Sequence, residues 1–145
     1  MKEFQIVSIN ISKTKGEKKK PVAEVELKVD LGLVGDGHAG LWHRQVSLLG
    51  TESIAKIQAK GLAVNPGDFA ENITTEGIEL FSLPIGTRLK LGKQAEVEIT
   101  QIGKKCHQGC AILKQTGDCV MPREGVFAKV VKSGKLMKGA VGKIL

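Results

Sequence analysis

The stretch AEVELKVD, residues 23–30, alternates apolar and charged side chains over its whole length. Successive side chains of a strand point to opposite faces of a sheet, so this pattern predicts a strand with one buried face. That face is expected to carry Val25, Leu27 and Val29. Residues 86–92 and 95–102 show the same alternation and are separated by a short turn, which predicts a hairpin.

The rest of the chain adds short elements separated by turns. Further strands are expected at 4–10, 44–49, 72–75, 125–131 and 138–145. One helix is expected over 51–60, capped by Thr51 and ended by Gly61. The 18 glycines suit many tight turns, and a 3% aromatic content requires a core of Val, Ile and Leu. We therefore predict one domain over residues 1–145, mainly β, barrel-like, with one or two short helices.

Composition and charge restrict the class of protein. No stretch has the ~18 apolar residues of a membrane-spanning helix, and the first residues lack the apolar core of a signal peptide. The chain has an odd number of cysteines, three, which argues against a disulfide framework, so we expect a cytoplasmic protein. The net charge of +7 is concentrated at the two ends of the chain, where it suits an anionic partner or a solvated surface. Scarce aromatic residues and the lack of a zinc-finger spacing argue against nucleic acid.

The glycine-rich segment Gly35-Asp-Gly-His38 is the first candidate site. Its backbone could approach a ligand closely, and Asp36 could orient His38 as a base or a metal ligand. The alternative is a tight turn in which Asp36 bonds its own backbone and His38 is exposed. The glycine spacing matches neither a Rossmann fingerprint nor a P-loop.

Two further segments carry candidate binding residues. In PGDFAEN, residues 66–72, a turn holds Asp68 and Asn72 close together, where they either orient a polar ligand or bond loop backbone. Arg123 precedes a predicted strand, and its guanidinium could grip an anion or form an ion pair with a loop carboxylate.

The segment that begins Lys104-Lys-Cys106-His107 holds the strongest chemical signal. Neighbouring cations lower the pKa of a thiol, and the thiolate is both nucleophile and metal ligand, so Lys104 and Lys105 favour a reactive Cys106. A structural zinc site is a second possibility, and buried inert thiols are a third. The zinc ligands would be Cys106, His107, Cys110 and Cys119.

Six segments in order resemble the MOSC domain, the module named for its place at the C-terminus of molybdenum-cofactor sulfurases. They are residues 35–38, Arg44-Gln-Val46, 66–73, 86–92, the Cys106 segment and 123–130. The resemblance runs from about residue 6 to 142 and implies a strand-rich barrel. It also implies a functional cysteine, matched by Cys106, that carries sulfur as a persulfide or ligates molybdenum. Cys110 and Cys119 depart from the family pattern.

The resemblance implies a protein that binds the molybdenum cofactor (molybdopterin) or carries sulfur for it. Lys104, Lys105, Arg123 and Arg44 would face the anionic pterin phosphate, Asp36 and His38 would line the pocket, and Asp68 and Asn72 would shape it. If the protein is an enzyme, its activity would be that of a sulfurtransferase. A pyridoxal-phosphate-dependent cysteine desulfurase or a molybdoenzyme would be its partner. The alternatives are a non-catalytic module that delivers the cofactor and a domain with a structural zinc.

Overall fold

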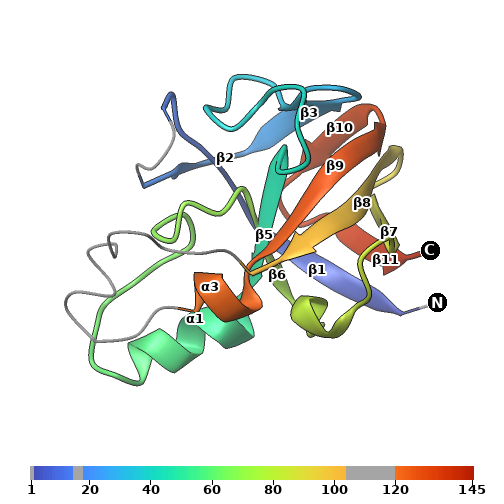
Figure 1. The fold of residues 1–145 in the computed structure, drawn as a ribbon. Helices are drawn as coiled ribbons and strands as arrows, with labels where there is room; N and C mark the ends of the chain where they lie inside the picture. The colour runs from blue at the N-terminus through green and yellow to red at the C-terminus, as the bar shows by residue number, and fades with distance from the viewer. Residues whose placement is uncertain (1, 15–17, 104–119) are drawn as a thin grey trace.

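Seven strands close into a barrel in the computed structural model, which describes residues 2–14, 18–103 and 120–145 (Figure 1). Around the barrel these are β11 (Val141–Ile144), β7 (Arg88–Leu91), β8 (Ala95–Ile102), β9 (Val126–Lys132), β5 (Val46–Gly50), β6 (Ile73–Glu76) and β1 (Glu3–Ile11). Pairing of β1 with β11 closes the ring, and among the described strands only β5 and β6 pair in parallel. The predicted mainly-β, barrel-like fold is confirmed.

A smaller sheet flanks the barrel and contains the strand on which the sequence analysis began. Its order is β10 (Gly134–Met137), β3 (Glu24–Lys28) and β4 (Gly32–Leu33), while β2 (Lys20–Val22) extends the barrel from β1. Val25 and Leu27 are buried on β3 as predicted. Val29 was placed wrongly on the buried face, because β3 ends at Lys28 and Val29 lies in the following turn, 44% exposed.

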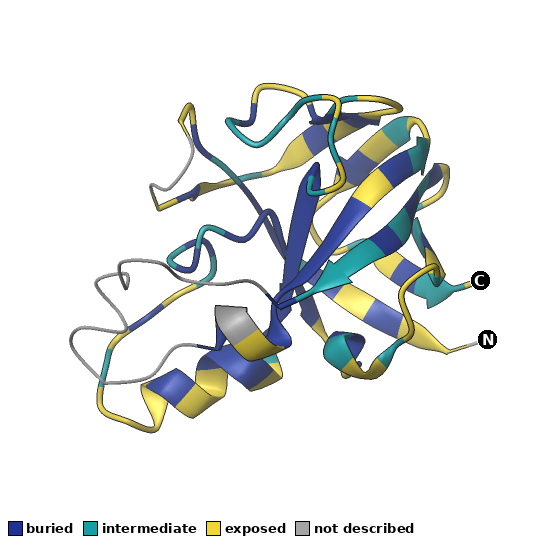
Figure 2. Ribbon diagram, viewed as in Figure 1, coloured by how far each residue is buried: buried dark blue, intermediate teal, exposed yellow. Residues whose placement is uncertain are grey.

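The barrel interior is filled by aliphatic side chains, as the low aromatic content requires. Figure 2 shows the resulting alternation of buried and exposed residues along the strands. Where Phe4 of β1 crosses β11, a Cβ at Gly142 would lie 2.3 Å from its ring, so only glycine fits there. A second core cluster joins the helix to the outside of the barrel through Leu49, Ile54, Ile57, Val64, Phe69, Val120 and Phe127.

Helix α1 (Thr51–Gln58) follows β5 directly. Its N-cap is Gly50, without a side-chain cap, so the prediction that Thr51 caps the helix is wrong by one residue; the helix also ends before Lys60. Short turns of helix occur at η1 (Leu80–Ser82) and α3 (Met121–Glu124). None of the helices in the described ranges is long and apolar enough to cross a membrane. The strand expected over 138–145 is β11 alone, because residues 138–140 form the turn from β10.

Candidate functional site

The loop between β4 and β5 brings the Gly35–His38 motif to one end of the barrel, where β1 ends and β5 and β6 begin. The Gly37 amide donates to the carbonyl of Ser12, just after β1, at 2.7 Å. Asp36 is buried beneath the loop and accepts from the Ser12 amide at 3.1 Å and from the His38 amide at 3.1 Å. The carboxylate therefore ties its own loop to the end of β1.

A lysine that the sequence analysis did not single out occupies the centre of this cluster. The Lys19 side chain is fully buried, and its Nζ lies 2.8 Å from Asp36 Oδ1, 3.0 Å from Ser12 Oγ and 3.0 Å from His38 Nδ1. His38 Nδ1 is 3.8 Å from the nearest Asp36 oxygen, beyond hydrogen-bond distance. The structure thus places Lys19 between the carboxylate and the imidazole that the sequence suggested as a direct pair.

The charge of Asp36 is balanced inside the protein. Burial by itself would raise the pKa of this carboxyl, but hydrogen bonds from the Lys19 side chain, the Ser12 backbone and the Asn72 side chain outweigh it, together with the charge of Lys19. The pKa of Asp36 therefore lies below its usual value of 3.8, and the group is ionised at neutral pH. Lys19 and Asp36 form a buried ion pair that cancels its own charge.

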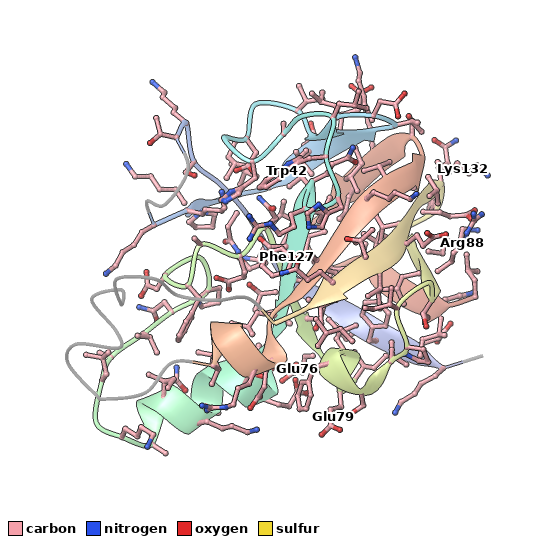
Figure 3. All side chains as sticks on the ribbon, viewed as in Figure 1. Trp42, Glu76, Glu79, Arg88, Phe127 and Lys132 are labelled. Atoms are coloured by element: carbon pink, nitrogen blue, oxygen red, sulfur yellow. The ribbon has the colours of Figure 1, made fainter. Side chains whose placement is uncertain are left out.

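The same loop continues into an aromatic wall, which we define as Trp42, Arg44 and Phe127. Figure 3 labels Trp42 and Phe127. The guanidinium carbon of Arg44 lies 4.7 Å from the centre of the Trp42 ring and 5.6 Å from that of Phe127 on β9. Trp42 is also parallel to the imidazole of His38, with ring centres 6.3 Å apart, and its indole N–H donates to the His38 carbonyl at 2.7 Å. The wall therefore connects Arg44 to the Lys19 cluster.

Arg44 differs from Lys19 in its polar contacts. Its Nε is buried and has no hydrogen-bond partner in the part of the chain that the structure describes. No ion pair among those residues involves Arg44. A buried cationic nitrogen without an acceptor is costly, and aromatic faces compensate only in part. Arg44 is thus a cation that a bound anion would satisfy.

In the described structure, the side chains of Asp68 and Asn72 form hydrogen bonds with backbone groups. Asp68 accepts from the Asn65 amide at 2.9 Å within its own turn. Asn72 is fully buried; its oxygen accepts from the Ser47 amide at 2.9 Å, and its amide group donates to the Asn10 carbonyl at 3.2 Å. The contacts of Asn72 join β1, β5 and the residue before β6, so Asn72 shapes this end of the barrel, whereas Asp68 supports its own turn.

A second buried carboxylate, Glu71, belongs to the same polar layer. One oxygen accepts from the Gly67 amide at 3.0 Å and from the Thr74 hydroxyl at 2.8 Å, whereas the other has no partner among the described residues. Burial raises the pKa of Glu71 above its usual 4.5, although these hydrogen bonds oppose the shift. A Cβ at Gly67 would lie 2.3 Å from the Lys19 carbonyl oxygen, so this turn packs tightly on the Lys19 segment.

Some predicted site residues lie away from the Asp36 loop, and others lie outside the described residues. Lys104, Lys105 and Cys106 lie outside the described residues, as do His107, Cys110 and Cys119. Arg123 is exposed on α3, which lies beside α1 and away from the Asp36 loop in Figure 1. Within the described ranges, no group of three His, Cys, Asp or Glu side chains could hold a metal ion.

A cavity of about 250 Å³ lies elsewhere, between α1, η1 and the end of β6. Its lining includes Glu52, Lys56, Phe81 and Glu124 but none of the predicted site residues that lie in the described ranges. Lys56 and Glu124 form an ion pair at 2.8 Å there, and Glu52 accepts from the Gly77 amide. The charges in this cavity are therefore largely satisfied, unlike that of Arg44.

Comparison with known proteins identifies the family. The model of the MOSC domain matches residues 35–145, most of the chain. The chain belongs to the MOSC domain family. The MOSC family is linked to molybdenum-cofactor biology, and the matched range contains the Asp36 loop, the aromatic wall and the Cys106 segment.

Solved MOSC-type structures share the fold of this MOSC domain. YuaD from Bacillus subtilis superposes with a TM-score of 0.83 at 18% identity, covering 99% of this chain and 96% of that one. YiiM from Geobacillus stearothermophilus gives 0.72 at 21% identity, covering 98% and 75%. YiiM from Escherichia coli gives 0.71 at 20% identity, covering 98% and 69%. No curated protein matches the chain significantly.

Proposed function

We propose that this MOSC domain binds the molybdenum cofactor through its anionic pterin phosphate, with Arg44 as the principal cation. The observation that carries the proposal is the buried Nε of Arg44, which has no partner among the described residues. A guanidinium offers planar donors that match phosphate oxygens, and hydrogen bonds between charged groups are the strong ones. The donor set at this end of the barrel therefore fits the phosphate of the cofactor.

The neighbouring residues support this role of Arg44 in different ways. Trp42 and Phe127 lie on the guanidinium and hold its orientation. Lys19 adds no free charge, because Asp36 neutralises it. Asn72 would maintain the backbone beneath the loop and Asp68 would maintain its own turn, so neither needs to contact the ligand. When bound, the cofactor would supply a metal centre whose chemistry a nearby thiol could assist.

We further propose that Cys106 is that thiol, as a sulfur carrier or a molybdenum ligand. Lys104 and Lys105 would favour its thiolate or neutralise phosphate. Arg123, on α3 and away from the Asp36 loop, has no part in the phosphate site proposed at Arg44. As a carrier, the Cys106 thiolate would attack the outer sulfur of a persulfide on a cysteine desulfurase. A new S–S bond forms on Cys106, the S–S bond of the donor breaks, and the thiolate of the donor leaves. No external oxidant is required, because the sulfur arrives already oxidised.

Binding can be followed with the single tryptophan of the chain, since Trp42 lies against Arg44. We would titrate Trp42 fluorescence with molybdenum cofactor released from a molybdoenzyme. Arg44→Met should weaken binding by about 10-fold to 100-fold, because a hydrogen bond to a charged group contributes roughly 1.5–3 kcal/mol. Arg88→Met is the matched control, since Arg88 is exposed on β7 and paired with Glu98. Equal affinity of the wild type and Arg44→Met would reject this role.

The role of Cys106 requires a separate measurement. We would record the intact mass of the protein after incubation with a cysteine desulfurase and cysteine. The wild type should gain one sulfur atom that a reductant removes, and Cys106→Ser should gain none, while Cys110→Ser and Cys119→Ser serve as controls. If wild-type Cys106 stays a free thiol, the carrier role is lost, and a binding and delivery module remains.

A further inference from the structure

We propose that Lys19 is a positioning residue that fixes His38 as the neutral Nε2–H tautomer, which makes His38 a hydrogen-bond donor to an anionic ligand. In that tautomer Nε2 bears the proton, so His38 is neither a base nor a metal ligand through that atom. The identity of the ligand rests on the proposed function, but the tautomer does not. Lys19 lies outside every motif that the sequence analysis considered.

The argument begins with the three hydrogens of the Lys19 ammonium. Its Nζ lies at 2.8 Å from Asp36 Oδ1, 3.0 Å from Ser12 Oγ and 3.0 Å from His38 Nδ1. An ammonium donates three hydrogen bonds and accepts none, so each neighbour must present a lone pair. The number of acceptors equals the number of hydrogens.

Each neighbour meets this requirement in only one way. Asp36 accepts as an ionised carboxylate. The hydroxyl of Ser12 gives its proton to the Thr14 carbonyl at 2.9 Å, so its oxygen accepts from Lys19. His38 Nδ1 must then carry a lone pair, and in a neutral imidazole the proton is left on Nε2.

The surroundings of His38 hold the ring in this orientation. Its own amide donates to Asp36 Oδ2 at 3.1 Å, which occupies the second carboxylate oxygen. Its carbonyl accepts from the indole of Trp42, and the two rings are parallel within 3°. A protonated imidazole would direct an N–H at the ammonium of Lys19, so the geometry also disfavours the imidazolium.

The consequence is a pair of donors joined by one aromatic ring. His38 offers Nε2–H and Arg44 offers its guanidinium, and both contact Trp42. A ligand that satisfies both must present several acceptor oxygens, as a phosphate ester or another oxyanion does. The selectivity of this end of the barrel for oxyanions would thus depend on Lys19, which need not touch the ligand.

Nitrogen NMR of the three histidines tests the tautomer directly. The protein would be labelled with ¹⁵N-histidine, and His38→Gln would assign the His38 signals. At neutral pH the wild type should show His38 protonated at Nε2 and bare at Nδ1. Protonation at Nδ1, or rapid exchange between both forms, would overturn the proposal without any variant of Lys19.

Variants of lysine then separate positioning from folding. Lys19→Met should convert His38 into a mixture of tautomers, whereas Lys19→Arg, which keeps a donor, should restore the Nε2–H form. Lys20→Met removes an equal charge from the exposed next residue and should leave the His38 signals unchanged. An unchanged tautomer in folded Lys19→Met would reject the role of Lys19.

Two substitutions of His38 test the donor itself, with inorganic phosphate as the probe and Trp42 fluorescence as the readout. The amide nitrogen of Gln lies where Nε2 was, whereas that of Asn lies nearer Nδ1. We expect His38→Gln to bind within about three-fold of the wild type and His38→Asn to bind about ten-fold more weakly. Equal affinity of the two variants would reject the donor role. A wild type with the expected tautomer that binds neither phosphate nor the cofactor would refute the proposed function while the role of Lys19 stands.

Discussion

Two neighbouring regions at one end of the barrel differ in whether their charged groups have polar partners. The polar base, which we define as Asn10, Lys19, Asp36, Glu71 and Asn72, is buried. Its side chains bond to one another and to the adjoining strands and loops, and one oxygen of Glu71 has no partner among the described residues. In the aromatic wall, the guanidinium of Arg44 lies against the rings of Trp42 and Phe127, but its Nε has no acceptor among the described residues. The contrast indicates that the base maintains the fold and the wall is available to a ligand.

The largest loss of stability is expected from Lys19→Met in the polar base. It would leave the Asp36 carboxylate buried without its ammonium, and removal of one partner from a buried ion pair costs about 3–5 kcal/mol. Urea denaturation would measure the free energy of unfolding, with Lys20→Met as the control. A loss below about 1 kcal/mol would mean that the pair is not the main support of the base.

A somewhat smaller loss is expected from Asn72→Ala. The Ser47 amide and the Asn10 carbonyl would lose their bonds to Asn72 in a buried layer, which should cost about 2–3 kcal/mol. Asp68→Ala is the comparison, because it removes only one bond in a more exposed turn and should cost less than about 1 kcal/mol. Equal losses in urea denaturation would contradict the difference that burial predicts.

Much of the fold was predictable because it depends on local pattern. The hairpin of β7 and β8 and the buried face of β3 follow from alternation within a few residues. Strands β2 and β4 were missed because three and two residues are too few for a pattern, and β10 was missed because only one of its four residues, Leu136, is buried. Val29 broke the pattern where the strand gave way to a turn.

The candidate site was predictable only in part. Motifs placed Asp36, His38 and Arg44 together, and the structure does bring these three to one end of the barrel. Lys19 was missed because it stands in a run of lysines that is typical of a solvated loop, while its partner Asp36 lies 17 residues away. That pairing depends on how β1 and the Asp36 loop pack, which no short stretch of sequence encodes. The roles of Cys106 and its lysines stay predictions.

Glu71→Gln should change how the free energy of unfolding varies with pH more than it changes the magnitude of that free energy. Because the pKa of Glu71 is raised in the folded state, the folded protein binds a proton more tightly than the unfolded chain. Its contribution is fully present below the usual pKa of 4.5 and is lost as the pH rises from there to the raised value. Glutamine has no proton to lose, so the variant should show a flatter decline in urea denaturation across that window. Glu76→Gln, exposed at the end of β6, should keep the wild-type slope.

The smallest effect on stability is expected from Arg44→Met in the aromatic wall. The variant loses contacts with two rings, worth about 0.5–1 kcal/mol at partly exposed sites, and removes a buried nitrogen that has no acceptor. These terms oppose each other, so the free energy of unfolding in urea should change by less than about 1 kcal/mol. The same variant is expected to lose most of its affinity for the cofactor phosphate. If instead it were destabilised as much as Lys19→Met, Arg44 would belong to the structural support of this barrel end, and the distinction between the base and the wall would fail.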